Sequence, residues 1–153
     1  MKKILLSIAL VLLIGLAGVC VAGGLYGGGS SSRLPTRIYV SVTGISAISE
    51  TATTLYTVPT GYTFYPTTVV IECTYINDNG DGAVASFGGN SATYDDYLNT
   101  QTYDFDAAGT FKPDAPTGVV VSQTAGDVFK IIIETASTSD SETWTVDLYG
   151  ILK

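Results

Sequence analysis

Aspartate and aromatic residues are interleaved over residues 94–106, in the stretch "YDDYLNTQTYDFD". Its carboxylates are Asp95, Asp96, Asp104 and Asp106, and its aromatic residues are Tyr94, Tyr97, Tyr103 and Phe105. Carboxylate oxygens bind calcium or accept hydrogen bonds from sugar hydroxyls, while aromatic faces stack on sugar rings or on a protein partner. The stretch is therefore a candidate calcium site and a candidate contact surface. A solvated acidic loop is the competing interpretation.

A second group of candidate cation ligands lies in "NDNGDG", residues 77–82. Asn77, Asn79 and Asp81 occupy alternate positions before Gly82, as at the start of a calcium-binding loop. The glutamate that completes such a loop further along the chain is missing, so a glycine-rich connection between two strands is the alternative. If calcium binds, it should raise the melting temperature.

The remaining chemistry is limited by the residue types that the chain lacks. The sequence has no histidine, which excludes Ser-His-Asp and Cys-His catalytic arrangements and removes the usual zinc ligand. No phosphate-binding loop or dinucleotide-binding fingerprint occurs. Acidic residues are present, but nothing in the sequence places two of them across a cleft, as glycoside hydrolysis requires. We therefore expect a protein that is not an enzyme and has no cofactor, with calcium as the candidate ion.

The chain is acidic, with 14 Asp and Glu residues against 7 Lys and Arg and a formal net charge of −7. No basic residue stands between Arg37 and Lys112. Such a charge distribution repels phosphate backbones and anionic lipid headgroups. Nucleic acid is therefore not an expected partner, and membrane contact is expected only through residues 4–22.

The N-terminal segment has the composition of an export signal. Two lysines precede an uncharged run, residues 4–22, and small residues follow. Cleavage after Ala22 would make residues 1–22 a signal peptide. The run is also close to the roughly 20 residues that a helix needs to cross a bilayer, so an uncleaved membrane anchor is the alternative. A lipoprotein linked through Cys20 is less favoured, because Val19 stands where that signal usually has a smaller residue.

Glycine and serine dominate residues 23–36, which we expect to be a flexible tether. The remaining residues, 37–153, show the period-two alternation of strands and no convincing helix. The candidate strands are residues 37–42, 53–58, 67–75, 82–88, 97–105, 117–123, 127–135 and 143–152. This spacing predicts one all-β domain, an antiparallel β-sandwich of about eight strands behind an N-terminal hydrophobic helix.

Alternation also predicts which side chains form the core. In the last two candidate strands the predicted core residues are Phe129, Ile131, Ile133, Trp144, Val146 and Leu148. In "TTVVIECTY" the predicted inner face is Val69, Ile71, Cys73 and Tyr75. With Cys20 in the N-terminal segment, Cys73 has no partner within the domain for a disulfide. We expect its thiol to be a small buried hydrophobe rather than a nucleophile.

Turn residues punctuate the strands in a distinctive order. Pro59 and Gly61 lie in "TLYTVPTGYTFYPTTVVIE", Gly126 and Asp127 lie in "GVVVSQTAGDVFKIIIET", and Gly150 lies in the closing "TWTVDLYGIL". With Thr57 and Val58, these positions resemble the "TVPxG" turn, the "xxGD" turn and the late glycine of a small jelly-roll domain found in bacteriophage virion proteins and phage-like surface proteins. The resemblance covers about residues 53–153. It implies a jelly-roll-type sandwich with a structural or adhesive role, without catalysis.

One feature departs from that family, because the virion proteins of tailed phages rarely carry an export signal. The N-terminus indicates an extracellular or cell-surface protein, a membrane-anchored one, or a subunit of a membrane-associated virion. We therefore expect a structural subunit that associates with itself or with other surface or virion proteins. A secreted module that binds glycan or a host surface is the second expectation. The third is a surface filament in which residues 37–44 are donated as a strand to a neighbouring subunit.

Overall fold

The structure, a computed structural model, describes residues 34–78, 80–89, 93–116 and 122–153. Its regular elements are the strands β1 (Thr36–Ser46), β2 (Ala52–Thr57), β3 (Phe64–Ile76), β4 (Ala83–Gly88), β5 (Leu98–Tyr103), β6 (Thr110–Asp114), β7 (Val128–Thr135) and β8 (Glu142–Leu152). The expected signal or anchor lies outside the described residues, as does most of the tether. Among the residues that are described, no helix is long and apolar enough to cross a membrane.

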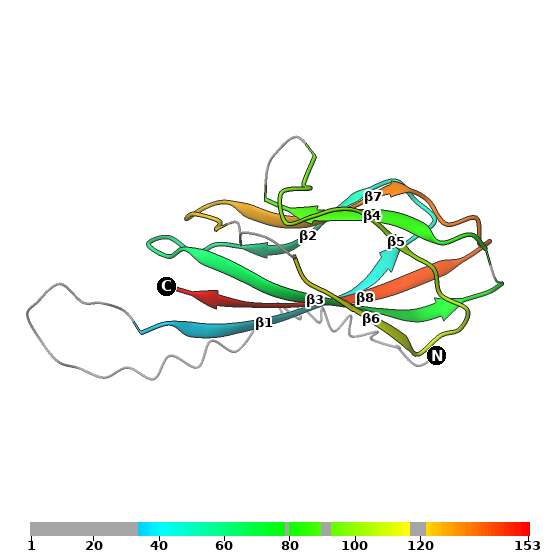
Figure 1. The fold of residues 1–153 in the computed structure, drawn as a ribbon, viewed down its shortest axis with the longest axis horizontal. Coiled ribbons are helices and arrows are strands. Elements are labelled where there is room, and N and C mark those ends of the chain that lie inside the picture. The colour runs from blue at the N-terminus through cyan, green and yellow to red at the C-terminus, as the bar shows by residue number, and fades with distance from the viewer. Residues whose placement is uncertain (1–33, 79, 90–92, 117–121) are drawn as a thin grey trace, which may run out of the picture. The chain divides into compact units, whose positions relative to one another are not determined.

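The strands form two antiparallel sheets, which we call the first sheet (β1-β8-β3-β6) and the second sheet (β2-β7-β4-β5). Figure 1 shows them as two layers. The chain passes from one sheet to the other at every connection except that between β4 and β5, which pair with each other. This strand order is that of a jelly roll. The predicted all-β sandwich of about eight strands is confirmed.

One strand of the sandwich was not predicted, and one predicted strand lies largely outside the described residues. In the predicted strand at residues 117–123, residues 117–121 lie outside the description, and Gln123 forms an isolated bridge with Phe64. The strand that was not predicted is β6, whose sequence "TFKPD" contains Pro113. Proline cannot donate a hydrogen bond to a neighbouring strand, so it is tolerated at a sheet edge, where β6 lies.

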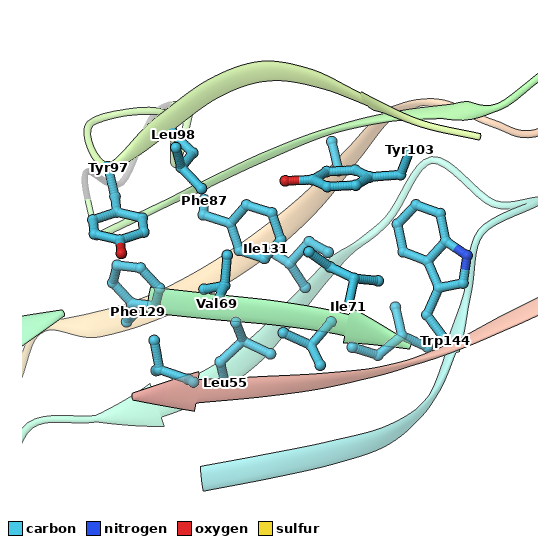
Figure 2. Close-up of a cluster of buried hydrophobic side chains, with 14 of the residues drawn as sticks. Leu55, Val69, Ile71, Phe87, Tyr97, Leu98, Tyr103, Phe129, Ile131 and Trp144 are labelled. Carbon is cyan, nitrogen blue, oxygen red and sulfur yellow. The ribbon is translucent and has the colours of Figure 1, made fainter. Parts of the chain in front are cut away.

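The space between the sheets is filled by the alternate side chains that the sequence indicates. All six residues predicted from the last two strands are at most 1% exposed. Figure 2 shows side chains from both sheets meeting in this core, with Trp144 beside Tyr103. Cys73 is a buried free thiol, as predicted. Tyr75 was predicted to be buried but is 52% exposed, because the register of β3 against β8 shifts between Cys73 and Tyr75.

The turns that carry the family resemblance meet at one end of the sandwich. The Tyr62 amide donates to the Pro59 carbonyl at 3.2 Å, and Gly61 between them has φ of 80°, a conformation that favours glycine. The Gly126 amide donates to the Val58 carbonyl at 2.9 Å, which ties the second turn to the first. These turn residues therefore have a structural role, because they fix the connection from β2 to β3 and the start of β7.

Gly150 belongs to the same end of the molecule. It pairs with Pro66 across β8 and β3, and a β-carbon on it would lie 2.5 Å from Cζ of Phe64. The Phe64 ring is fully buried and packs against Tyr56 and Phe129, with centroid distances of 4.8 and 6.1 Å. The late glycine of the motif thus makes room for a core aromatic ring.

Candidate interaction surface

Three of the four aromatic residues predicted as a contact surface lie in the core. Tyr97, Tyr103 and Phe105 are 5%, 2% and 1% exposed. Tyr97 packs edge-on against Phe129, and both Tyr103 and Phe105 pack against Trp144. The expectation failed because residues 103 and 105 continue the alternation of a strand and face inward together. This aromatic group stabilises the sandwich and presents no surface to a partner.

The fourth residue, Tyr94, is half-buried against the outer side of the second sheet. The Lys130 ammonium donates to the Tyr94 hydroxyl at 3.0 Å and lies 4.6 Å from the centre of its ring. These two residues line a small depression of about 250 Å³, together with Gly89, Gly126 and Asp127. Because the side chains of Lys130 and Tyr94 interact with each other, they hold the loop after β4 against β7.

The four aspartates of the same stretch lie in different surroundings. Asp96 accepts hydrogen bonds from the Gly89 amide at 2.7 Å and from the Gln123 side chain at 3.2 Å. Asp95 accepts one from the Thr93 hydroxyl at 2.6 Å. Asp104 and Asp106 are exposed beyond the end of β5. Asp96 therefore has a structural role, connecting the β4–β5 loop to the segment before β7.

The candidate calcium ligands of residues 77–82 that the structure describes lie at the surface. Asn77 and Asp81 are exposed, and Asn79 lies outside the described residues. Their neighbour Asp78, which the sequence did not single out, accepts hydrogen bonds from the Ser139 hydroxyl at 2.7 Å and the Asp140 amide at 3.1 Å. In the described ranges, no three His, Cys, Asp or Glu side chains come close enough together to hold a metal.

Burial alters the acid–base properties of several interior groups, among them Cys73 and Tyr103. Burial, then the charge of nearby Glu142, raises the pKa of the Cys73 thiol above its ordinary value. Burial, then the charge of Asp114 and the 3.0 Å hydrogen bond to it, raises the pKa of the Tyr103 hydroxyl. A thiol that is held protonated and shielded from solvent is a poor nucleophile, which agrees with its assignment as a core residue.

The exposed aromatic side chains lie mainly on the first sheet. Tyr39 of β1 and Tyr149 of β8 are paired in register and are 57% and 39% exposed. Their ring centroids are 5.1 Å apart, and the Tyr39 hydroxyl donates to Asp147 at 3.1 Å. Desolvation, then the charge of Asp147, raises the pKa of Tyr149. We call these two rings the tyrosine pair.

A shallow depression of about 400 Å³ lies beside the tyrosine pair. Arg37, Thr67, Thr68, Tyr149 and Ile151 contribute to its lining. The lysines of the described residues stack on aromatic rings, Lys112 on Phe105, Lys130 on Tyr94 and Lys153 on Tyr65. Arg37 has no such partner among the described residues. The outer face of the first sheet thus offers two aromatic rings, hydroxyl groups and a cation to a partner.

This surface was not predicted from the sequence, although the sequence contains the alternation that indicates it. Tyr39 lies between the inward-facing Ile38 and Val40, and Tyr149 follows the inward-facing Leu148. Alternation alone therefore places each tyrosine outside the sandwich. That the two tyrosines are neighbours depends on β1 pairing with β8, which only the complete fold reveals.

Comparison with known proteins identifies the fold. No protein-family model and no curated protein matches the chain. A chain of the cyanophage Pam1 capsid asymmetric unit is similar, with a TM-score of 0.52 and 18% identity over 88% of this chain and 97% of that one. A chain of the acid-stable capsid of Helicobacter pylori bacteriophage KHP30 gives a TM-score of 0.49 and 15% identity, over 77% and 93%. A chain of the Bacillus endospore appendages, which form disulfide-linked pili, gives 0.29 and 15%, over 83% and 97%. The resemblance to phage virion proteins is thus confirmed for the fold, since this chain shares its jelly roll with a phage capsid chain.

Proposed function

We propose that this protein is a non-enzymatic structural protein, a jelly-roll subunit of a virion-like particle or of a cell-surface assembly. The observation that carries the proposal is the similarity to the Pam1 capsid chain, which extends over 88% of this chain and 97% of that one. Because the match extends over nearly the whole of both chains, it supports a similar structural role for this chain. A jelly roll is itself compatible with many functions, so the proposal also depends on the chemistry of this chain.

Several polar groups that could have served chemistry instead form hydrogen bonds that maintain the fold. Asp96 and Asp78 bind backbone amides and loop side chains, as described above. Glu142, 2% exposed, accepts a hydrogen bond from the Trp144 indole at 2.6 Å. Ser86, fully buried, donates to Glu134 at 2.5 Å and accepts from the Thr100 amide at 2.8 Å. These uses support a structural role over a catalytic one.

The site of action follows from the N-terminal sequence. On this proposal residues 1–22 act as the signal or anchor that directs the domain to the membrane or across it, and residues 23–36 act as the tether between that segment and the domain. The protein is then an extracellular or cell-surface subunit, or part of a membrane-associated virion. The intact mass of the protein from its native host tests this step, because cleavage after Ala22 removes 22 residues and a retained anchor removes none.

Assembly is the property to test first. The chain has a mass of 16.0 kDa. Size-exclusion chromatography with light scattering, on the full-length protein in mild detergent, should give a defined multimer after the detergent contribution is subtracted. A single 16.0 kDa species at every concentration would refute the structural proposal.

A glycan-binding module is the second candidate, favoured by the exposed tyrosine pair beside the depression of about 400 Å³. Aromatic rings next to hydroxyl groups and an arginine suit a saccharide. A glycan array with the wild-type protein and a Tyr149→Ala variant tests this candidate. Binding that the variant loses would support it, and an array without signal would reject it.

The filament candidate has less support. Residues 37–44 belong to β1, which is paired with β8 of its own chain, so donation to a neighbour would require this pairing to break. Deletion of residues 37–44 would abolish assembly if the strand is donated. Unchanged stability and assembly would exclude it.

A further inference from the structure

The four edges of the two sheets differ in how well they are protected from further pairing. At the edge of the first sheet, β6 has five residues and includes Pro113. At the edges of the second sheet, β5 has a left-handed residue, Thr100 with φ of 51°, and the pairing of β2 is interrupted between Thr54 and Tyr56. Short length, proline and irregularity are features that prevent edge strands from pairing with other chains.

The fourth edge, β1, has none of these protections over most of its length. It has 11 residues, and its register with β8 is continuous from Thr36 to Val42. Its sequence, "TRIYVSVTGIS", contains no proline and no acidic residue, and Arg37 is its only charged residue. Figure 1 shows β1, in blue, at the margin of its layer. No described residue pairs with the free side of this strand.

The side chains of β1 also leave apolar area to be covered. Ile38, Val40 and Val42 face the core but are only half-buried, because they lie at the margin of the sandwich. On the opposite face, Tyr39 is 57% exposed. A further strand beside β1 would cover both sets and satisfy the free backbone groups.

We propose that β1 pairs antiparallel with β1 of a second copy, which joins the first sheets of two subunits across a two-fold axis. The second copy is the favoured occupant because its β1 is also open, whereas a head-to-tail contact would require one of the protected edges. The strand has no acidic residue in a chain with a net charge of −7, so two copies of β1 can approach without opposing carboxylates on the paired strands. This inference rests on the proposed assembly function and identifies one of its contacts.

The alternation of β1 determines the register of this contact. Inner-face residues must oppose inner-face residues, and all three apolar residues are paired only if Val40 faces Val40 of the second copy and Ile38 faces Val42. Tyr39 then faces Ser41 and lies diagonal to Tyr39 of the second copy, within reach of an aromatic ring. The two tyrosine pairs would therefore form one cluster across the axis.

A contact of one strand is small compared with the roughly 1,200–2,000 Å² that stable interfaces bury. We therefore expect it to be weak between two free subunits and to persist where other contacts hold many copies together. Disulfide trapping suits such a contact. Directly opposed residues in antiparallel strands have Cα atoms about 4.5–5.5 Å apart, within the range that a disulfide spans.

The test uses the full-length protein with Cys20→Ser, and Val40→Cys as the trap. The matched control is Ser41→Cys, one residue further along the same strand, which does not face its own copy in this register. Under a mild oxidant, Val40→Cys should form a disulfide-linked dimer at least about tenfold faster than Ser41→Cys. Equal rates, or no dimer from a folded Val40→Cys protein, would overturn the proposal. Fluorescence of Trp144, the only tryptophan, reports whether each variant is folded.

A second pair of variants does not depend on oxidation. Val40→Lys places two ammonium groups opposite each other at the axis and should weaken self-association about tenfold, as measured by light scattering. Thr102→Lys, on the exposed edge strand β5, should leave it unchanged. If a multimer forms and Val40→Lys has no effect, the β1 contact is wrong and the assembly function stands. If the wild-type protein remains monomeric at every concentration, both are wrong.

Discussion

Replacement of Gly150 by alanine should destabilise the domain through one identified contact. The added methyl group would lie 2.5 Å from Cζ of Phe64 and 2.7 Å from the Tyr65 carbonyl oxygen. Carbon atoms in contact prefer about 3.5–4.0 Å, so the overlap with the ring is about 1 Å. Phe64 is fully buried and cannot swing into solvent. Overpacking of this kind costs about 1–3 kcal/mol, and we expect about 2.5 kcal/mol because a backbone atom is involved as well.

Urea denaturation followed by Trp144 fluorescence measures this cost, because the single tryptophan is fully buried. With an m-value of about 1.5 kcal/mol/M, the midpoint should fall by roughly 1.7 M. In a double-mutant cycle, Phe64→Leu removes most of the ring and should recover about 1 kcal/mol of the loss. Recovery is partial because the Tyr65 carbonyl remains. Gly109→Ala, with φ of 82° and open space around it, gives the cost of backbone strain alone. A Gly150→Ala loss below about 0.5 kcal/mol, or no coupling to Phe64, would mean that the close approach of Gly150 to the Phe64 ring does not limit stability.

Three further predictions follow from the interior and the loops. Trp144→Ala should lower the free energy of unfolding by about 3–5 kcal/mol, since it empties a fully buried site and removes the donor to Glu142; a loss below 2 kcal/mol in thermal melts would contradict this. Burial raises the pKa values of Tyr97 and Tyr103 above 10.0 and that of Cys73 above 9.0, so the folded state retains protons that the unfolded chain releases. Stability should therefore be complete below about pH 9 and fall above it by up to about 1.4 kcal/mol per pH unit for each group, whereas equal urea midpoints at pH 8 and pH 11 would exclude the effect. If either acidic stretch binds calcium, millimolar calcium raises the melting temperature, and an unchanged temperature rejects calcium binding.

The features that sequence predicted well depend on local alternation. Phe129, Ile131 and Ile133 are buried because every second residue of a strand faces the same side, and this holds whatever the neighbouring strands are. Gly61 and Gly126 mark turns because their backbone conformation is rare for other residues. Such signals are contained within a few residues, so no knowledge of the fold is required to use them.

The features that sequence missed depend on contacts between distant segments. Tyr75 is exposed because β3 shifts its register against β8, and β6 is a strand because its partner β3 supplies the pairing. The tyrosine pair joins residues 110 positions apart, since Tyr149 pairs with Tyr39. Tyr103 and Phe105 were predicted to lie on a surface because aspartates are next to them in the sequence. The period-two pattern alone places both side chains inside the sandwich, and this is where they lie.

Negative-stain electron microscopy of the full-length protein in mild detergent asks directly whether the subunits assemble. We expect multimers of uniform size and symmetry, formed by a protein whose monomer mass is 16.0 kDa. Fields that contain only dispersed monomers, at concentrations up to those at which the protein remains soluble, would contradict this expectation.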